Sequence, residues 1–141
     1  MILAYDIGGS RIRAAVWDGH LSPAGEVATP VADRAAFLEK LAGFATGRRL
    51  RGLAMSIAGV VDPATGLGKV ANIPAMDGLA LGPAAEAATG LPVLVLNDAD
   101  CFALAEARQG AGRGQRTVFG VILGSGVGGG LAIDGQVVTG A

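Results

Sequence analysis

The first segment that could do chemistry reads Asp6-Ile7-Gly8-Gly9-Ser10. Successive glycines in a tight turn let several backbone N–H groups point at one spot, an arrangement that favours phosphate oxygens. Ser10 can add a hydroxyl donor, and Asp6 can hold the water shell of a phosphate-bound Mg²⁺. An ordinary hairpin, in which Asp6 caps its own turn, explains the same residues. The segment alone leaves both interpretations open.

A second glycine-rich segment spans residues 123–130 and formally matches the pattern G-x-G-x-x-G. A dinucleotide-binding fold requires a helix directly after these glycines, but residues 131–135 read as a strand and a hairpin turn. A Walker A loop is excluded as well, because Gly68-Lys69 lacks both the earlier glycine and the following Ser or Thr. The alternatives that remain are a second phosphate loop within a hairpin and a glycine-rich turn without a ligand.

The third segment is the pair Asn97-Asp98, which follows an apolar stretch and opens a predicted helix. α/β sheets place ligand chemistry at such strand ends. Phosphoryl transfer to a sugar needs a base for the attacking hydroxyl, a metal, and donors around the phosphates. Asp98 could be that base, and Asn97 could add a hydrogen bond to the sugar ring. Capping of the following helix is the better account of Asp98 in isolation, and the two glycine segments shift the balance to catalysis.

The elements that must position these segments alternate between strand and helix. Asp33 is a predicted N-cap, Gly47 and Gly90 are predicted helix ends, and a glycine-and-arginine linker at 110–115 is the best candidate domain boundary. Strands are predicted at residues 2–7, 12–17, 26–29, 53–61, 92–96, 117–123, 130–133 and 136–139, and helices at 34–46, 83–88 and 99–108.

Composition narrows the class of protein. Hydrophobic residues make up 51% and aromatic residues only 4%, which predicts an aliphatic core. The net charge of −1 implies no basic face and argues against nucleic acid as a partner. A single cysteine, Cys101, cannot form an internal disulfide and fits a reducing, cytoplasmic compartment. No apolar run is long enough to predict a membrane span, and the N-terminus does not resemble a signal peptide.

Taken together, four segments resemble one known family. They are residues 5–12, 71–74, 97–106 and 122–131. In these segments the chain resembles the ROK family (repressors, open reading frames and kinases) of the actin-like ATPase superfamily. The stretches 71–75 and 97–106 look most like the bacterial N-acetylglucosamine kinases of that family.

The resemblance implies a fold and an activity. The fold is α/β: an actin-like ATPase (ribonuclease H-like) lobe at 1–114, whose mixed sheet starts with an antiparallel hairpin and carries helices on its faces. Residues 115–141 would be the opening strands of a second lobe. The implied activity is ATP-dependent phosphorylation of the 6-hydroxyl of a hexose or N-acetylhexosamine. N-acetylglucosamine is the first choice of acceptor. Glucose, N-acetylmannosamine and fructose stay open as acceptors.

The resemblance also implies roles for individual residues. Asp98 would be the general base, and Asn97, Gly59 and Asn72 would line the sugar. The ATP phosphates and Mg²⁺ would meet the two glycine segments, with Asp6 holding the metal through water. The residues implied for the nucleotide are Asp6, Gly8, Gly9, Ser10, Gly124, Ser125, Gly126, Val127 and Gly128.

Some positions depart from the family pattern. Ser10 and Ser125 stand where the family has Thr, which keeps the hydroxyl, and Asp100 replaces an Asn. The family's Gly-Glu…Gly-His sugar segment, most of its adenine pocket and its His-plus-three-Cys zinc site lie beyond the matched positions. The resemblance therefore implies no zinc ligand in these 141 residues and weak turnover by this chain alone.

The same resemblance implies binding partners and raises alternative classes of protein. The predicted partners are a sugar and ATP, with no nucleic acid and no membrane, and a homodimer could form through the sheet edge that begins near residue 117. A sugar-sensing ROK repressor carries a DNA-binding helix-turn-helix before the first glycine segment, and here the first strand is predicted to start at Ile2. A non-catalytic actin-like scaffold does not account for Asn97-Asp98 and the 72–74 loop.

Overall fold

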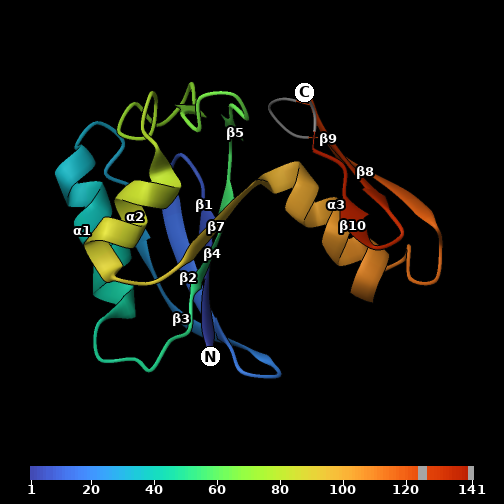
Figure 1. Ribbon diagram of the computed structural model, residues 1–141, viewed down its shortest axis with the longest axis horizontal. Helices are drawn as coiled ribbons and strands as arrows, with labels where there is room; N and C mark the ends of the chain where they lie inside the picture. Colours follow the sequence, from blue (N-terminus) through green and yellow to red (C-terminus); the bar gives the residue numbers. More distant parts are fainter. Residues whose placement is uncertain (124–126, 140–141) are drawn as a thin grey trace. The chain divides into compact units, whose positions relative to one another are not determined.

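The computed structural model describes residues 1–123 and 127–139, which form two compact units, Met1–Leu96 and Asn97–Ala141 (Figure 1). The first unit contains β1 (Ile2–Ile7), β2 (Arg11–Trp17), β3 (Leu21–Ala28), α1 (Arg34–Ala45), β4 (Leu53–Ile57), β5 (Val60–Val61), β6 (Gly68–Lys69), α2 (Leu81–Thr89) and most of β7 (Val93–Asn97). The second contains α3 (Asp98–Gln109), β8 (Thr117–Leu123), β9 (Val127–Ile133) and β10 (Gln136–Val137).

A five-stranded sheet in the order β3-β2-β1-β4-β7 forms the centre of the first unit. β1 and β2 are antiparallel, and Asp6 pairs with Arg13 in their register. β1 and β4 are parallel. The sheet is therefore mixed and begins with an antiparallel hairpin, which confirms the predicted fold class.

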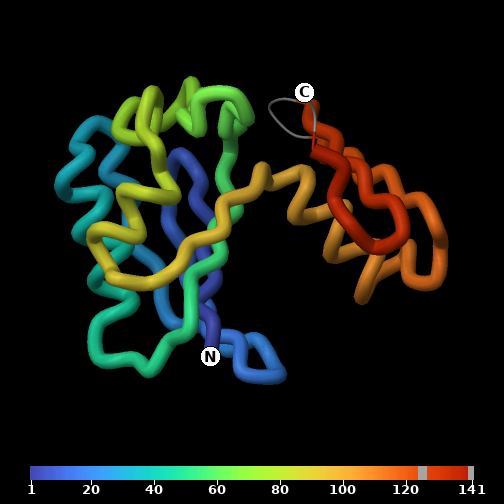
Figure 2. The backbone as a smooth tube through the Cα atoms, in the orientation of Figure 1, coloured from blue at the N-terminus to red at the C-terminus, as the bar shows by residue number. Residues whose placement is uncertain are grey.

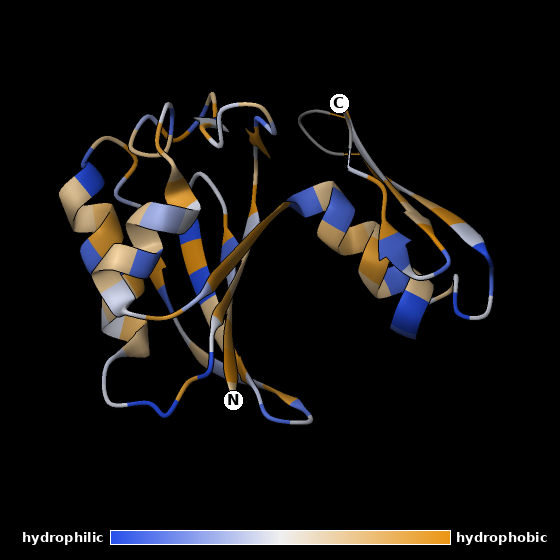
Figure 3. Cartoon of the chain, viewed as in Figure 1, coloured by the Kyte–Doolittle hydropathy of each residue, from blue (hydrophilic) through white to orange (hydrophobic). Residues whose placement is uncertain are grey.

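The core of the first unit lies between this sheet and the helices α1 and α2, which cover the same face of the sheet (Figure 1). Successive side chains of a strand point to opposite faces, so Leu3, Tyr5 and Ile7 of β1 all reach this core. Phe37 of α1 and Leu81 of α2 meet them there. Figure 3 shows the apolar residues along the strands of the sheet.

Helix α1 begins and ends where its capping residues predict. The Asp33 carboxylate accepts a hydrogen bond from the Ala36 N–H at 2.9 Å, and Gly47 adopts a positive φ of 75° just beyond the helix. Helix α2 begins at Leu81, before the predicted start at Pro83, because proline is tolerated throughout a first turn whose N–H groups have no partner in the helix.

Two strands of the first unit differ substantially from the prediction. β3 begins at Leu21 and not near residue 26, because Pro23 is tolerated in an edge strand. The predicted strand 53–61 is broken, since β4 ends at Ile57 and β5 pairs with β6 in a separate sheet. At the break, a β-carbon on Gly59 would lie 2.7 Å from a Val70 methyl carbon, so the chain turns where its backbone passes close to another segment.

In the second unit, α3 packs on the antiparallel strands β8 and β9. β8 has the predicted bounds, whereas β9 begins at Val127 and not at residue 130. Gly120 leaves room for the helix, since a β-carbon there would lie 3.1 Å from the Cα of Ala103. Along the chain, the first compact unit ends at Leu96, and the division of the family's lobes at residue 114 stays a prediction.

The described residues contain no helix that is both long and apolar enough to cross a bilayer.

Candidate active site

The turn between β1 and β2 carries the first glycine segment, Gly8 to Ser10, which we call the glycine loop. The Gly8 N–H donates to the Arg11 carbonyl at 3.0 Å and closes the turn. Gly9 and Ser10 are exposed, and their N–H groups have no protein acceptor among the described residues. Such free donors in a tight turn are what an anion-binding loop needs.

Thr29 holds the glycine loop from behind. Its hydroxyl donates to the Gly8 carbonyl at 2.7 Å, and its N–H donates to the Ser10 carbonyl at 3.1 Å. Thr29 is only 9% exposed and is the one polar residue buried among those the structure describes. The Gly8 and Ser10 carbonyls thus bond inward to Thr29, and the Gly9 and Ser10 N–H groups remain available to a ligand.

Asp6 precedes the glycine loop on the sheet face that α1 and α2 leave open. Its carboxylate is exposed and lies 3.5 Å from an Arg13 guanidinium nitrogen. A second Arg13 nitrogen lies 3.4 Å from Glu26. Exposed ion pairs of this kind contribute little, so the Asp6 carboxylate is free to turn to a ligand. A hollow of about 520 Å³ on this face is lined in part by Ala4, Asp6, Arg13 and Glu26.

The loop at residues 70–77, which we call the sugar loop after its predicted role, lies beside the glycine loop. A β-carbon on Gly9 would stand 3.8 Å from the Cβ of Asn72. Asn72 is exposed, whereas its neighbour Ile73 is fully buried. Figure 2 shows residues 58–80 gathered at the end of the first unit where β1 turns into β2. Gly59 touches the start of the sugar loop at Val70.

Asn97 and Asp98 stand at the beginning of α3. Asn97 is the N-cap, and the Ala99 N–H donates to the side-chain oxygens of both residues at 2.9 Å. The helix therefore begins at Asp98, one residue before the predicted start, with Asp98 half-buried in the first turn. Negative charge is favoured at this end of a helix, where free N–H groups gather. Capping and catalysis are compatible, because Asp98 shares the cap with Asn97 and keeps a second carboxylate oxygen.

Asp100 lies on the same turn of α3. Burial raises the pKa of its carboxyl, and the negative charge of Asp98 raises it further. Two carboxylates so close disfavour double ionisation. Asp100 thus places a second carboxyl in the same turn of α3 as the predicted base.

The second glycine segment is described only in part. Gly124, Ser125 and Gly126 lie outside the described residues. Val127 opens β9 and is 81% exposed, and a β-carbon on Gly128 would stand 3.6 Å from the Cβ of Ala99. The strand that leaves this segment therefore lies against the first turn of α3, next to the predicted base.

The structure thus gathers the predicted residues into two groups, one in each compact unit. The first unit brings together the glycine loop, Asp6, Gly59 and Asn72. The second brings Asn97 and Asp98 to the helix end against which Gly128 packs. Among the described residues, no cluster of three His, Cys, Asp or Glu side chains could hold a metal by itself.

Two residues that support this site, Thr29 and Arg34, were not identified from the sequence. Thr29 leaves no signal in the sequence, because its role depends on a contact with Gly8, far back in the chain. Arg34 does leave one. It is a cation in the first turn of α1, where the helix dipole favours anions, and such a residue indicates a compensating contact.

Comparison with known proteins places these features in a family. The model of the ROK family matches residues 2–141. The chain is 39% identical to an N-acetyl-D-glucosamine kinase of Erwinia tasmaniensis, over 99% of the chain and 48% of that protein. The chain thus spans about half the length of the curated relatives it matches.

Solved structures of ROK family proteins have the same fold as this chain. A ROK hexokinase from Thermus thermophilus has a TM-score of 0.88 and 33% identity, over 99% of this chain and 49% of that one. A ROK family glucokinase from Streptomyces griseus, in complex with glucose and AMPPNP, has a TM-score of 0.84 and 32% identity, over 99% of this chain and 46% of that one. The glycine loop, the sugar loop and Asn97-Asp98 all fall within the matched residues, and the chain belongs to the ROK family.

Proposed function

We propose that this chain provides the phosphate loops and the catalytic base of an ATP-dependent kinase that phosphorylates the 6-hydroxyl of a hexose or N-acetylhexosamine. The observation that carries this proposal is the close approach of Gly9 and Asn72. It sets a loop with free N–H donors beside an exposed amide that can bind a sugar hydroxyl. Phosphoryl transfer needs the phosphate donor and the sugar acceptor to be bound side by side.

Each residue has a defined role in this proposal. Asp98 accepts the proton of the attacking 6-hydroxyl, and Asn97, Asn72 and Gly59 orient the sugar. The glycine loop and residues 124–128 donate hydrogen bonds to the phosphates. This assignment is supported by the exposure of Gly9, Ser10 and Asn72 and by the position of Asp98 at a helix N-terminus.

Asp6 is the residue that would hold Mg²⁺. Its exposed carboxylate stands at a strand end next to the glycine loop, and Mg²⁺ in kinases is commonly held by one or two carboxylates together with waters and substrate phosphates. When bound, the ion neutralises charge on the phosphates. Asp6 would hold that ion through a water molecule.

N-acetylglucosamine is the first choice of acceptor. The support is the name of the Erwinia relative, an N-acetyl-D-glucosamine kinase. Glucose is the second candidate, supported by the likeness to the Streptomyces glucokinase. N-acetylmannosamine and fructose complete the set. A coupled assay of the full-length protein across these four sugars tests the choice. The highest kcat/KM with N-acetylglucosamine supports it, and turnover with none of them would refute the kinase proposal.

The chain alone is a weak kinase in this proposal, because it spans about half of its relatives. Normal turnover by purified 141-residue protein would contradict this. We further propose that the protein acts in a reducing, cytoplasmic compartment and can form a homodimer through β8, the edge strand of the second unit's sheet. Light scattering that shows a monomer at high concentration would count against the dimer.

A further inference from the structure

A short segment between β3 and α1, residues 29–34, contacts both ligand loops of the first unit. We call this segment the brace. It begins with Thr29, directly after β3, and ends with Arg34, the first residue of α1. One end thus follows β3 directly and the other end begins α1, so the segment is anchored on each side.

One end of the brace bonds to the glycine loop. The Thr29 hydroxyl donates to the Gly8 carbonyl at 2.7 Å, and the Thr29 N–H donates to the Ser10 carbonyl at 3.1 Å. The first and last residues of the loop are thus tied to a single buried residue. We therefore expect loss of the Thr29 hydroxyl to alter the direction in which the loop N–H groups point.

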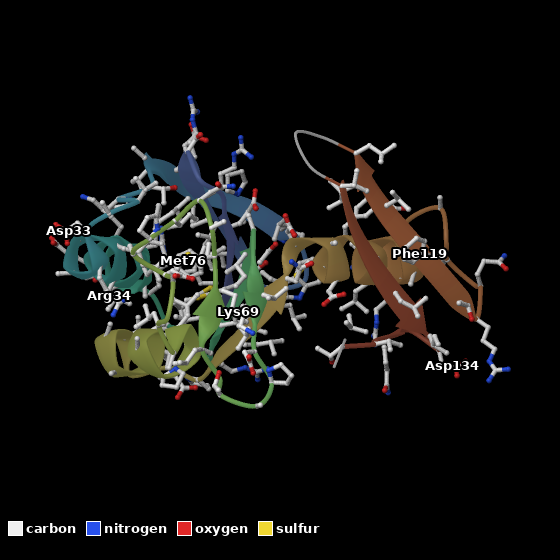
Figure 4. All side chains as sticks on the ribbon, turned by 90° about the horizontal axis from the view of Figure 1, so that it is seen from above. Asp33, Arg34, Lys69, Met76, Phe119 and Asp134 are labelled. Carbon is white, nitrogen blue, oxygen red and sulfur yellow. The ribbon has the colours of Figure 1, made fainter. Side chains whose placement is uncertain are left out.

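The other end bonds to the sugar loop. The Ala75 N–H donates to the Val31 carbonyl at 2.9 Å. The Arg34 guanidinium donates to the Ala75 carbonyl at 3.1 Å and to the Asp77 carbonyl at 3.0 Å. Figure 4 labels Arg34 at the start of α1. It also labels Met76, which stands between Ala75 and Asp77 in the chain. Arg34 thus offsets its unfavourable place at a helix N-terminus with two charge-assisted hydrogen bonds.

The sugar loop is closed on itself by a hydrogen bond between its two ends. The Asp77 carboxylate accepts a hydrogen bond from the Val70 N–H at 3.1 Å and joins the two ends of the loop. Ile73 and Met76 are buried in the core, 0% and 1% exposed. Bonds that fix residues 75 and 77 therefore also fix Asn72, which the loop presents to solvent.

We propose that the brace is a positioning element that sets the spacing between the glycine loop and Asn72. Thr29 and Arg34 control nucleotide and sugar binding through it, although neither side chain touches a substrate. This inference rests on the proposed kinase function. It adds that the two substrate sites of the first unit share one support, so that loosening either end affects the other.

Kinetics of the full-length protein test the first part. In Arg34→Met the KM for the sugar should rise about tenfold, as expected when hydrogen bonds from a charged group are lost, and the KM for ATP should also rise, by a smaller factor. Arg34→Lys should recover part of the loss, because a single ammonium can reach one carbonyl. In Thr29→Val the KM for ATP should rise by a similar factor, and Thr29→Ser should stay near wild type. Unchanged KM values in Arg34→Met and Thr29→Val would overturn the proposal.

Amide hydrogen exchange tests the shared support and does not depend on activity. Thr29→Val should speed exchange at the Ala75 N–H, at the far end of the brace, and Arg34→Met should speed exchange at the Thr29 N–H. Lys40→Met, an exposed substitution on the same helix, is the matched control and should leave both amides protected. Exchange that changes only next to each substitution would refute a shared support.

The two readouts separate this inference from the proposed function. A wild-type protein that phosphorylates no sugar refutes the kinase, and the exchange experiment still decides the brace. A wild-type protein that is active, with variants whose KM values and exchange match it, refutes the brace alone. Melting temperatures of all variants show whether any loss of binding comes from unfolding.

Discussion

Gly130 of β9 lies directly against the backbone of Ala99 in the first turn of α3. A β-carbon on Gly130 would overlap the Ala99 carbonyl and would stand 2.8 Å from the amide nitrogen of Asp100. This glycine therefore serves the packing of a helix on a sheet. The glycine-rich segment therefore has two roles. Gly130 lets β9 pack against the helix turn that contains Asp98, and the residues before β9 are candidates for phosphate binding.

Gly130→Ala should destabilise the second unit, because neither neighbouring backbone atom can move aside. Overpacking of this kind costs about 1–3 kcal/mol, and a backbone clash belongs at the upper end. Gly128→Ala is the matched control, since its β-carbon would meet the Ala99 Cβ at 3.6 Å and the Ile122 Cβ at 4.0 Å, both ordinary contact distances. Urea unfolding followed by circular dichroism measures both. Equal stability of the two variants would contradict this account of Gly130.

Asp98→Asn should abolish most of the proposed activity of the full-length protein. The amide keeps the size and the helix-capping oxygen of Asp98 but cannot accept the proton of the 6-hydroxyl, so kcat should fall about 100- to 10,000-fold. The KM for the sugar should change little, since Asn97 and Asn72 are intact. A coupled kinase assay measures both constants. Asp100→Asn, the nearby control, should retain most of its kcat, and an active Asp98→Asn enzyme would mean that the base lies elsewhere.

Tyr5→Phe should weaken the attachment of α1 to the sheet. The buried Tyr5 hydroxyl donates to the Leu41 carbonyl at 2.7 Å, and its ring meets Phe44 edge-on with centroids 6.0 Å apart. The substitution removes the hydrogen bond and keeps the ring, so the free energy of unfolding should fall by about 1 kcal/mol. Chemical denaturation of the two proteins gives this difference. A variant as stable as wild type would show that the hydroxyl adds nothing to the core.

Asp62 should make stability depend on pH in the acid range. Its carboxylate accepts hydrogen bonds from the Lys69 ammonium at 2.8 Å and from the Ala64 N–H at 2.9 Å, and these lower its pKa to about 2. An unfolded Asp titrates near pH 3.9, so the stabilisation is complete above about pH 5 and is lost as the pH falls through about 4 to 2.

Melting temperatures of wild type and Asp62→Asn between about pH 2 and pH 7 test this dependence. The gap between the two proteins should be constant at neutral pH and should close below about pH 4. A gap that persists at about pH 2 would show that the ionised carboxylate is not its cause.

Much of the first unit could be predicted because its signals are local. The apolar alternation of β1 and the cap at Asp33 appear in the structure as expected, since each depends on residues a few positions apart. The predictions for β3 and for residues 53–61 were wrong at particular points. Pro23 disfavours a strand unless the strand lies at a sheet edge, and the continuous apolar run hid the turn at Gly59.

The candidate site, too, could be predicted from the sequence only in part. The sequence by itself determined which residue types are present for phosphate, metal and proton chemistry, because glycine turns and strand-end carboxylates are recognisable from their neighbours. Only the tertiary structure decided that Gly9 lies beside Asn72, that Thr29 and Arg34 support both loops, and that Gly130 makes room for α3. These contacts join residues distant in the chain. They arise from the packing of helices on sheets, which no local pattern specifies.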